Sequence, residues 1–331
     1  MGIRDIAKDC KVSVATVSRV LNGTKFVSKD LQEKVLASIE RQGYVADHIA
    51  RSMVLKKTFT IGLIIPNISD MYHQMVFSSV ESTLEASGFK VLVCRVQDTL
   101  RNERIYLDLL LQNRVDGIIL MHESNNPDVY AQLKKTQVPI VLAGIDIPGL
   151  QFPQVRIDDF SAAFDGTRYL LKLGHKKIGL IAGSGYSVGD KRLDGYKKAL
   201  EEYHIPFDDS ILEGGGYTIE SGYRAMKALL QRNPSLDAVF VLSDEMAVGA
   251  LSAAFEQHLS VPKDLSLLGF DGITLSAFTT PKLTTVSQPI SEIGKKAASI
   301  LLQMLQTDET VPKLTLLDHT IQEGASCIPR Q

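Results

Sequence analysis

Tryptophan is absent from this sequence of 331 residues, and only three cysteines occur. Cys10, Cys94 and Cys327 lie far apart and are odd in number, so they form neither a disulfide framework nor a zinc-binding spacing. Such sparse cysteine usage indicates a reducing compartment, the cytoplasm, and we predict no structural metal. Cys10 and Cys94 fall in apolar patterns, so we expect both to be buried.

Long apolar runs and catalytic signatures are also absent. No stretch reaches the roughly 18 apolar residues of a membrane span, and the charged opening IRDIAKDCK is unlike a signal peptide. The chain has no HExxH motif, no GxSxG motif and no paired cysteine and histidine. His122 and Glu123, at the end of an expected strand, are more typical of a surface than of a catalytic site. We therefore predict neither a membrane protein nor an enzyme, and no cofactor.

Positive charge is concentrated near the N-terminus. Residues 1–60 hold 11 Lys and Arg against 6 Asp and Glu, whereas the remaining 271 residues hold 25 against 32. A basic N-terminal segment followed by an acidic remainder suggests that the N-terminal segment binds a polyanion.

Residues 1–46 follow the pattern of three short helices. Residues 3–10 place apolar side chains on one face, a short turn follows, and a second helix runs from about 14 to 21. Ser13 can cap the second helix, Ser28 can cap a third, and Gly43 is suited to end it. This arrangement predicts a helix-turn-helix domain.

The second helix has two unlike faces. Val17, Val20 and Leu21 share one side at the helical period, which is the pattern of a core face. The opposite side carries small neutral side chains and one cation, namely Val14, Ala15, Ser18, Arg19 and Asn22. An ordinary solvated face would carry several Lys and Glu, so this smooth face favours a flat partner such as the edge of a DNA groove.

Residues 47–58 form a short amphipathic stretch that Asp47 can cap. A helix of this length is marginal alone. We predict a linker that folds when it meets a surface.

From Phe59 onward, short apolar strands alternate with longer helices. We expect strands at 60–66, 90–96, 116–121, 139–144, 154–157, 176–183, 238–244 and 265–271. We expect helices at about 72–87, 101–113, 128–136, 161–173, 191–203, 218–232, 245–257 and 290–305. This alternation predicts an α/β core of two doubly wound parallel-sheet lobes. The expected ranges are 59–158 with 290–317 for the N-lobe, and 159–289 with 318–331 for the C-lobe.

Ligands of doubly wound sheets bind at the carboxyl ends of the strands. The polar residues that follow the expected strands are therefore the site candidates: Asn67, Asp70, Asp146, Ser184, Ser243, Asp244 and Asp271. Each can instead be a helix cap or a hydrogen-bond partner between strands. This applies most to Asp244, which can cap the helix expected at 245–257.

The chain resembles, over nearly its whole length, the LacI/GalR family of bacterial transcription repressors. The family's helix-turn-helix signature is similar to IRDIAKDCKVSVATVSRVLNG, and its hinge helix to IARSM. Blocks typical of its core are RVDGIIL, LGHKKIGLIAG, RLDGY, ESGYRAM, SDEMAVGA, LLGFDG and PKLTTVSQP. The resemblance implies a DNA-binding headpiece at 1–46, a hinge helix at 47–58 and a periplasmic binding protein type I-like core at 59–331. It also implies a homodimer on palindromic operator DNA.

The resemblance assigns the outer face of the second helix to DNA. Val14, Ala15 and Arg19 match the positions that reach base edges in the major groove, where Arg19 could pair with guanine. The side chains assigned to phosphates are Thr16, Ser18 and Asn22.

In the hinge, Ala50 keeps the family pattern. Met53 falls where the family usually has a leucine wedge in the minor groove. Asp47 departs from the usual asparagine and brings negative charge near phosphates.

The resemblance also selects an effector site from the strand ends and their neighbours. Its expected ligands are Asp70, Tyr72, His73, Arg192, Tyr217, Ser243, Asp244, Asp271 and Gln288. Aromatic rings would meet the apolar faces of a sugar, and carboxylates, amides and arginine would meet its hydroxyls. We therefore expect a small-molecule effector, a sugar or sugar derivative.

One position departs from the family. Many members place a ligand-binding aspartate after the strand PIVL, where this chain has Gly144, with Asp146 two residues later. Asp146 is therefore a candidate substitute. The change resembles the branch that contains the catabolite control protein, which uses a phosphorylated protein as corepressor, so a protein corepressor is an alternative.

Together these features predict a cytoplasmic, sequence-specific repressor or regulator. Effector binding would change lobe closure and the spacing of the hinges, a coupling of roughly 1–3 kcal/mol. We expect a dimer, because no leucine-heptad tail follows the core. The alternatives are a regulator activated by a protein corepressor and a solute-binding protein, which would not bind DNA.

Overall fold

The computed structural model describes residues 2–22, 26–43, 57–96, 100–124, 126–183, 187–307 and 309–330. The chain divides into two units, Met1–Thr58 and Phe59–Gln331. The expectations for Asp47, Ala50, Met53 and Ser184 lie outside the described residues.

The N-terminal unit contains α1 (Ile3–Cys10), α2 (Val14–Asn22) and α3 (Lys29–Gln42). The Ser13 Oγ accepts a hydrogen bond of 3.1 Å from the Thr16 N–H, so Ser13 caps α2 as predicted. Gly43 ends α3 with a φ of 59°, which glycine adopts without strain. The small core of this unit is formed by Ile6, Ala7, Cys10, Val17 and Val35. The predicted burial of Cys10 and Val17 is therefore confirmed, and Val20 packs against this core while partly buried.

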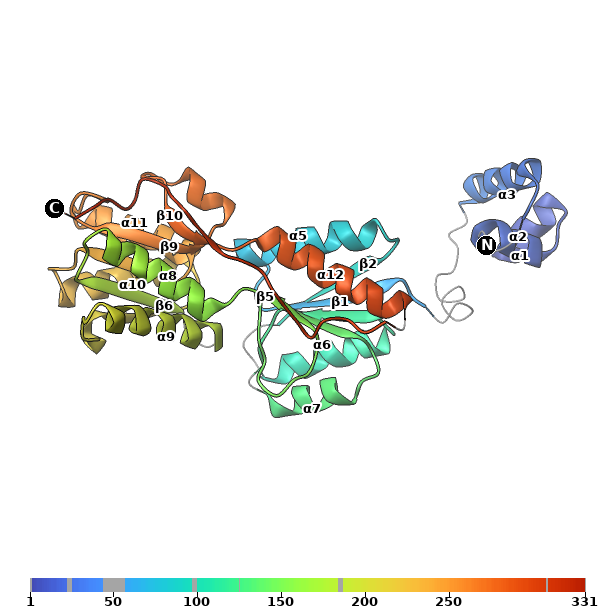
Figure 1. Ribbon diagram of the computed structural model, residues 1–331. Helices are drawn as coiled ribbons and strands as arrows, with labels where there is room; N and C mark the ends of the chain where they lie inside the picture. Colours follow the sequence, from blue (N-terminus) through green and yellow to red (C-terminus); the bar gives the residue numbers. More distant parts are fainter. Residues whose placement is uncertain are drawn as a thin grey trace. The chain divides into compact units, whose positions relative to one another are not determined.

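The first sheet of the second unit has the strand order β11-β5-β4-β3-β1-β2. Its strands are β1 (Thr60–Ile65), β2 (Lys90–Arg95), β3 (Gly117–Leu120), β4 (Ile140–Ala143), β5 (Gln154–Arg156) and β11 (Leu314–Leu316). All of its strand pairs are parallel. One face is covered by α5 (Met71–Glu85) and α12 (Ile290–Gln306), and the other by α6 (Leu100–Gln112) and α7 (Pro127–Lys135) (Figure 1). We call this sheet with its helices the N-lobe.

The second sheet has the order β12-β10-β9-β8-β6-β7. Its strands are β6 (Ile178–Gly183), β7 (Leu212–Gly215), β8 (Ala238–Val241), β9 (Ser266–Asp271), β10 (Thr284–Ser287) and β12 (Thr320–Gln322). One face is covered by α8 (Asp159–Lys172) and α9 (Ser187–Glu202), and the other by α10 (Ile219–Arg232) and α11 (Asp244–Glu256). We call this sheet with its helices the C-lobe.

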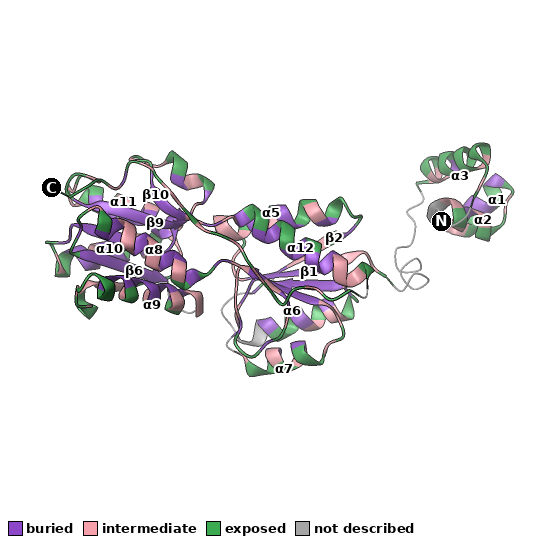
Figure 2. Cartoon of the chain, in the orientation of Figure 1, coloured by how far each residue is buried: buried purple, intermediate pink, exposed green. Residues whose placement is uncertain are grey.

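The central strands of both sheets are buried, the edge strands are partly exposed, and the covering helices expose their outer faces (Figure 2). Two parallel-sheet lobes, each covered on both faces, confirm the predicted fold class. Four strands, β7, β10, β11 and β12, are not among those expected from the sequence, and β12 pairs antiparallel with β10. These strands have three or four residues each and lack a continuous apolar run.

The chain passes from the first sheet to the second after β5, returns after β10 and passes over again after β11. Several helices begin at the carboxyl edges of these sheets. Asp70 caps α5, Asp158 caps α8 and Thr218 caps α10, each through its side-chain oxygen. The residues around these helix starts are thereby fixed at the edge where ligands of doubly wound sheets bind.

Candidate functional site

The outer face of α2 has the exposure expected of a nucleic-acid interface. Val14 is 40% exposed, and Ala15 and Arg19 are also exposed, while Val17 on the opposite side is fully buried. Thr16 lies 2.9 Å from Ser13 through their hydroxyl oxygens, which orients it at the start of the helix. Ser18 is partly exposed. The side chain of Asn22 lies outside the described part of the chain.

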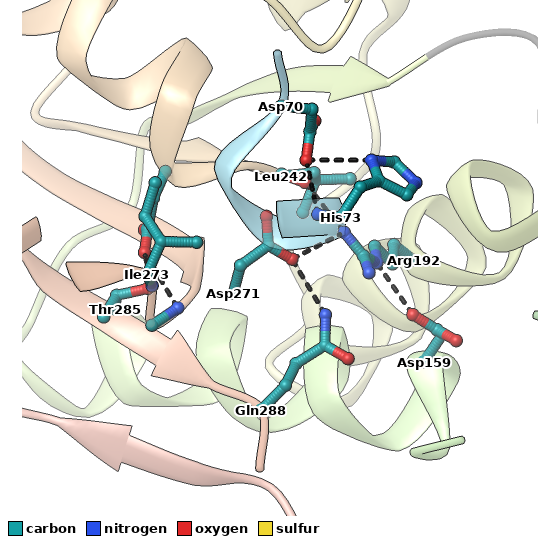
Figure 3. A network of polar contacts seen from close by, with 11 residues as sticks. Asp70, His73, Asp159, Arg192, Leu242, Asp271, Ile273, Thr285 and Gln288 are labelled. Carbon is teal, nitrogen blue, oxygen red and sulfur yellow. Dashed lines mark hydrogen bonds and ion pairs between the residues drawn. The ribbon is translucent and has the colours of Figure 1, made fainter. Parts of the chain in front are cut away.

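The centre of the C-lobe site is Arg192, on α9, which is only 6% exposed (Figure 3). Its Nε donates to Asp159 Oδ1 at 2.8 Å, and its Nη1 donates to the Leu242 carbonyl at 2.9 Å. The guanidinium carbon lies 3.8 Å from the centre of the Phe270 ring. Burial alone would lower the pKa of Arg192, but the carboxylates of Asp159 and Asp271 outweigh burial and raise it. Arg192 is therefore a permanent, well-oriented donor.

Asp271 ends β9 beside this arginine, with its Oδ1 3.6 Å from Arg192 Nη1. The same oxygen accepts from Gln288 Nε2 at 2.8 Å. Burial raises the pKa of Asp271 well above its usual range, although Arg192 opposes the shift. Asp271 also has a φ of 111°, which residues other than glycine rarely adopt. Strain of this kind is maintained where the position of a side chain matters.

On the N-lobe side of the candidate site, Asp70 lies at the start of α5. Its Oδ1 accepts from the His73 backbone N–H at 3.0 Å and lies 2.9 Å from His73 Nδ1. Tyr72 is directed at Gly144, because a Cβ at Gly144 would collide with the Tyr72 hydroxyl. Gly144 has a φ of 72°, the left-handed conformation that favours glycine. The Tyr72 hydroxyl therefore fills the space that a side chain at position 144 would need.

Tyr72 also connects the two lobes electrostatically. Burial raises its pKa, and the carboxylates of Asp271 and Asp159 in the C-lobe add to the rise. The phenol stays protonated and can donate. Asp70 is among the charges that act on Asp271. The side chains of Asp70 and Tyr72 in the N-lobe thus lie near the carboxylates of Asp159 and Asp271 in the C-lobe.

Asp146 is engaged in ion pairs. Its Oδ2 lies 2.5 Å from Lys191 Nζ on α9 and 3.6 Å from Arg156 Nη2. The Asp146 backbone carbonyl accepts from Ser187 Oγ at 3.1 Å. Asp146 is thus a contact between the lobes, and its role toward a ligand stays a prediction.

Asp244 is fully buried and bonded within the protein. Its Oδ2 accepts from the backbone N–H groups of Gly272 and Ile273 at 2.8 and 3.0 Å, and its Oδ1 accepts from the Thr285 hydroxyl at 2.7 Å. Asp244 therefore fixes the loop directly after Asp271. Ser243, the N-cap residue of α11, is 3% exposed.

Tyr217 precedes the cap of α10 and has a φ of 57°. Its ring lies against Gly183 at the end of β6, where a Cβ would collide with it. The small residue at the strand end thus lets the aromatic ring reach the carboxyl edge of the sheet.

Two carboxylates that the sequence analysis did not select connect the lobes. Glu123 of the N-lobe accepts from the Ser187 N–H at 2.7 Å, and Glu245 of the C-lobe accepts from the Met71 N–H at 2.7 Å. Each binds the first N–H of a helix in the other lobe, where the helix dipole favours an anion. Asp159 was missed as well, because two adjacent aspartates after a strand are typical of a helix cap.

The surface position expected for His122 is wrong. His122 is 8% exposed, and its Nε2 lies 2.8 Å from Glu103 Oε1. Glu103 also binds the Ser124 hydroxyl, and Tyr130 donates to the Ser124 carbonyl at 2.5 Å. These contacts join the residues that follow β3 to α6 and α7. The polar side chains of His122 and Ser124 are therefore buried.

Within the described residues, no group of His, Cys, Asp and Glu side chains has an arrangement that could hold a metal ion. No helix in the described part of the chain is both long and apolar enough to cross a membrane.

Comparison with known proteins identifies both parts of the chain. Residues 2–47 match the family model "Bacterial regulatory proteins, lacI family", and residues 167–327 match "Periplasmic binding protein-like domain". Catabolite control protein A of Priestia megaterium is 36% identical over 322 residues, which is 97% of each chain.

Solved structures extend the similarity to the fold. The Lac repressor dimer bound to operator and the anti-inducer ONPF has a TM-score of 0.89 at 27% identity, covering 99% of each chain. The complex of transcriptional regulator CelR with cellobiose has a TM-score of 0.76 at 28% identity, covering 98% of this chain and 99% of that one.

Proposed function

The chain belongs to the lacI family of bacterial regulatory proteins and is a DNA-binding transcription regulator, and we propose that a sugar or sugar derivative bound between its lobes controls its affinity for operator DNA. We propose that it binds a palindromic operator in the cytoplasm as a homodimer, with a headpiece at 1–46, a hinge at 47–58 and a core at 59–331. The Lac repressor, which has the same fold, is a dimer on its operator.

On the DNA side, we propose that Val14, Ala15 and Arg19 meet base edges. The exposed, nearly uncharged face of α2 supports this assignment, because it can approach a groove closely. The side chains proposed to meet phosphates or the minor groove are Thr16, Ser18, Asn22, Ala50 and Met53.

One observation carries the effector proposal. The Met71 N–H at the start of α5 in the N-lobe donates to Glu245 of the C-lobe at 2.7 Å, and Figure 3 shows Asp70 of the same helix start in one polar network with Arg192 and Asp271. Hydrogen-bonding side chains beside aromatic rings suit a sugar, whose hydroxyls need both donors and acceptors. The residues proposed to line the site are Asp70, Tyr72, His73, Asp146, Arg192, Tyr217, Ser243, Asp271 and Gln288, and we assign Asp244 to positioning Asp271.

A thermal-shift screen of sugars and sugar derivatives on the full-length protein tests this proposal. We expect at least one compound to raise the melting temperature by mass action. Its effect should disappear in Arg192→Met, while the matched variant Arg232→Met, at an exposed ion pair with Glu213, should respond like the wild type. An unchanged response in Arg192→Met would refute the site.

A second candidate function is activation by a protein corepressor. The 36% identity to catabolite control protein A favours it, and so does Gly144, which removes one expected ligand contact. A gel shift with palindromic DNA separates the candidates. Tighter binding with a sugar alone supports the effector, whereas tightening only when a protein fraction is added supports the corepressor.

A further inference from the structure

We propose that the effector of this cleft carries no negative charge, so that the site takes an uncharged polyhydroxyl compound and rejects its phosphorylated or carboxylated relatives. The inference rests on the function proposed above and adds the charge class of the ligand.

The first reason is that the buried cation is already neutralised. A guanidinium is the usual partner of an anionic ligand. Here Arg192 is bonded to Asp159 at 2.8 Å, and the Asp159 side chain is only 3% exposed (Figure 3). An anion that displaced Asp159 would leave a buried carboxylate without its partner, which is strongly unfavourable. The hydroxyl of an uncharged ligand can accept from the arginine without breaking this pair.

The second reason is that two further cations among the described residues near the lobe contacts, Lys191 and Arg156, share one carboxylate. Lys191 and Arg156 both approach Asp146 Oδ2, at 2.5 and 3.6 Å. Arg156 also donates to Gln154 Oε1 and to the Ile157 carbonyl, each at 2.9 Å. The guanidinium of Arg156 therefore donates to acceptors of the protein itself. Lys191 is held by its ion pair with Asp146, which joins the two lobes.

The third reason is the balance of charge among the described residues of the cleft. The cations in these contacts are Arg156, Lys191 and Arg192. The carboxyl groups in them or next to them, apart from Asp271 with its raised pKa, are Asp70, Glu123, Asp146, Asp159 and Glu245. In a site of low dielectric constant, such an excess of acidic groups repels a phosphate or carboxylate. The same groups accept hydrogen bonds well from the hydroxyls of an uncharged polyol.

Inorganic phosphate is the probe for the wild-type protein. We expect the melting temperature of the full-length protein to be the same in about 10 mM phosphate as in chloride of equal ionic strength. Stabilisation by phosphate that Arg192→Met abolishes would overturn the proposal. This titration requires no known effector and no DNA. Failure of the proposed function would appear instead as sugars that change neither the melting temperature nor DNA binding.

Asp159→Asn tests the cause of the exclusion. Asparagine keeps the size and the acceptor oxygen but removes the charge, so phosphate should now raise the melting temperature. Asp165→Asn is the matched control, because Asp165 lies on the same helix and pairs with Arg168 and His319. Circular dichroism and DNA binding verify the fold of both variants. A folded Asp159→Asn protein that phosphate does not stabilise would contradict the assigned role of Asp159.

Discussion

At the scale of the residue, Arg19 is the exposed cation of a face otherwise formed by small side chains. Arg19→Ala should lower affinity for the operator about 5–150-fold, since a bidentate contact with guanine contributes roughly 1–3 kcal/mol of discrimination. Affinity for unrelated DNA should change far less. Anisotropy titrations on both DNAs measure the ratio.

Lys8→Ala is the matched control, because Lys8 is an exposed cation on α1. Any loss in this variant should be equal on both DNAs. An equal loss in Arg19→Ala would argue against its role in reading bases.

The buried carboxyl group of Asp244 predicts how the stability of the protein changes with pH. Burial raises its pKa from 3.8 to about 7, although hydrogen bonds, including those from Thr285, Gly272 and Ile273, oppose the rise. Because the folded-state pKa lies above the unfolded value, the folded protein binds this proton more tightly, and stability falls as pH rises between these two values. Asp244→Asn can keep the contacts, with its amide donating to Thr285. The Asp244→Asn substitution should therefore reduce the fall in the free energy of unfolding between low and neutral pH by on the order of 1–4 kcal/mol.

Urea unfolding at about pH 5 and about pH 8 measures the decline. Asp237→Asn is the control. Burial opposes the shift at Asp237, but bonds from His175 and from the backbone of Lys176 and Lys177 lower its pKa. Because its pKa is lowered, Asp237 contributes its full stabilisation at both pH values and loses it only in stronger acid. If Asp244→Asn kept the slope of the wild type, the assigned ionisation would be wrong.

Some residues of the candidate site are predictable from the sequence, and others are not, for a physical reason. Arg192, Asp271 and Gln288 were expected near one another, and they form direct contacts. Asp159 was not expected, because its partner Arg192 lies 33 residues away and no local pattern connects the two. Its burial depends on the packing of α8 against α9.

At the scale of the element, Glu123 and Glu245 each hold the start of a helix in the opposite lobe. Glu123→Gln with Glu245→Gln should weaken both contacts, since an amide interacts less favourably with a helix N-terminus. We expect amide hydrogen exchange in the first turns of α5 and α9 to become about 3–10-fold faster, equivalent to roughly 0.7–1.4 kcal/mol.

The matched control for these variants is Glu256→Gln. Glu256 lies on α11 with Glu245, but its partners Tyr223 and Lys227 belong to the same lobe. It should leave exchange in α5 and α9 unchanged. Unaltered exchange in the double variant would show that these contacts do not hold the lobes together.

The helices and longer strands were predictable because their patterns are local. Strands such as β1 and β6 are continuous apolar runs buried on both faces. β10 is almost equally buried, yet its residues are Thr284, Thr285, Val286 and Ser287. It is a strand because β9 and β12 pair with it, and such pairing is absent from local composition. β11 and β12 similarly depend on strands far away in the chain.

At the scale of the whole molecule, the chain crosses between its lobes after β5, β10 and β11. A ligand that contacts both lobes can bias their closure only by the difference of its affinity for the two states. The proposed site has this property, because Tyr72 and Arg192 come from different lobes and act on the same cluster.

The most direct test of the account is the affinity of the full-length protein for palindromic DNA recovered by in vitro selection. Anisotropy titrations are made with and without a saturating amount of the uncharged sugar that most raises the melting temperature. We predict that the dissociation constant changes by roughly 5–150-fold and that Arg192→Met abolishes the change. An identical dissociation constant with and without the bound sugar would contradict the account.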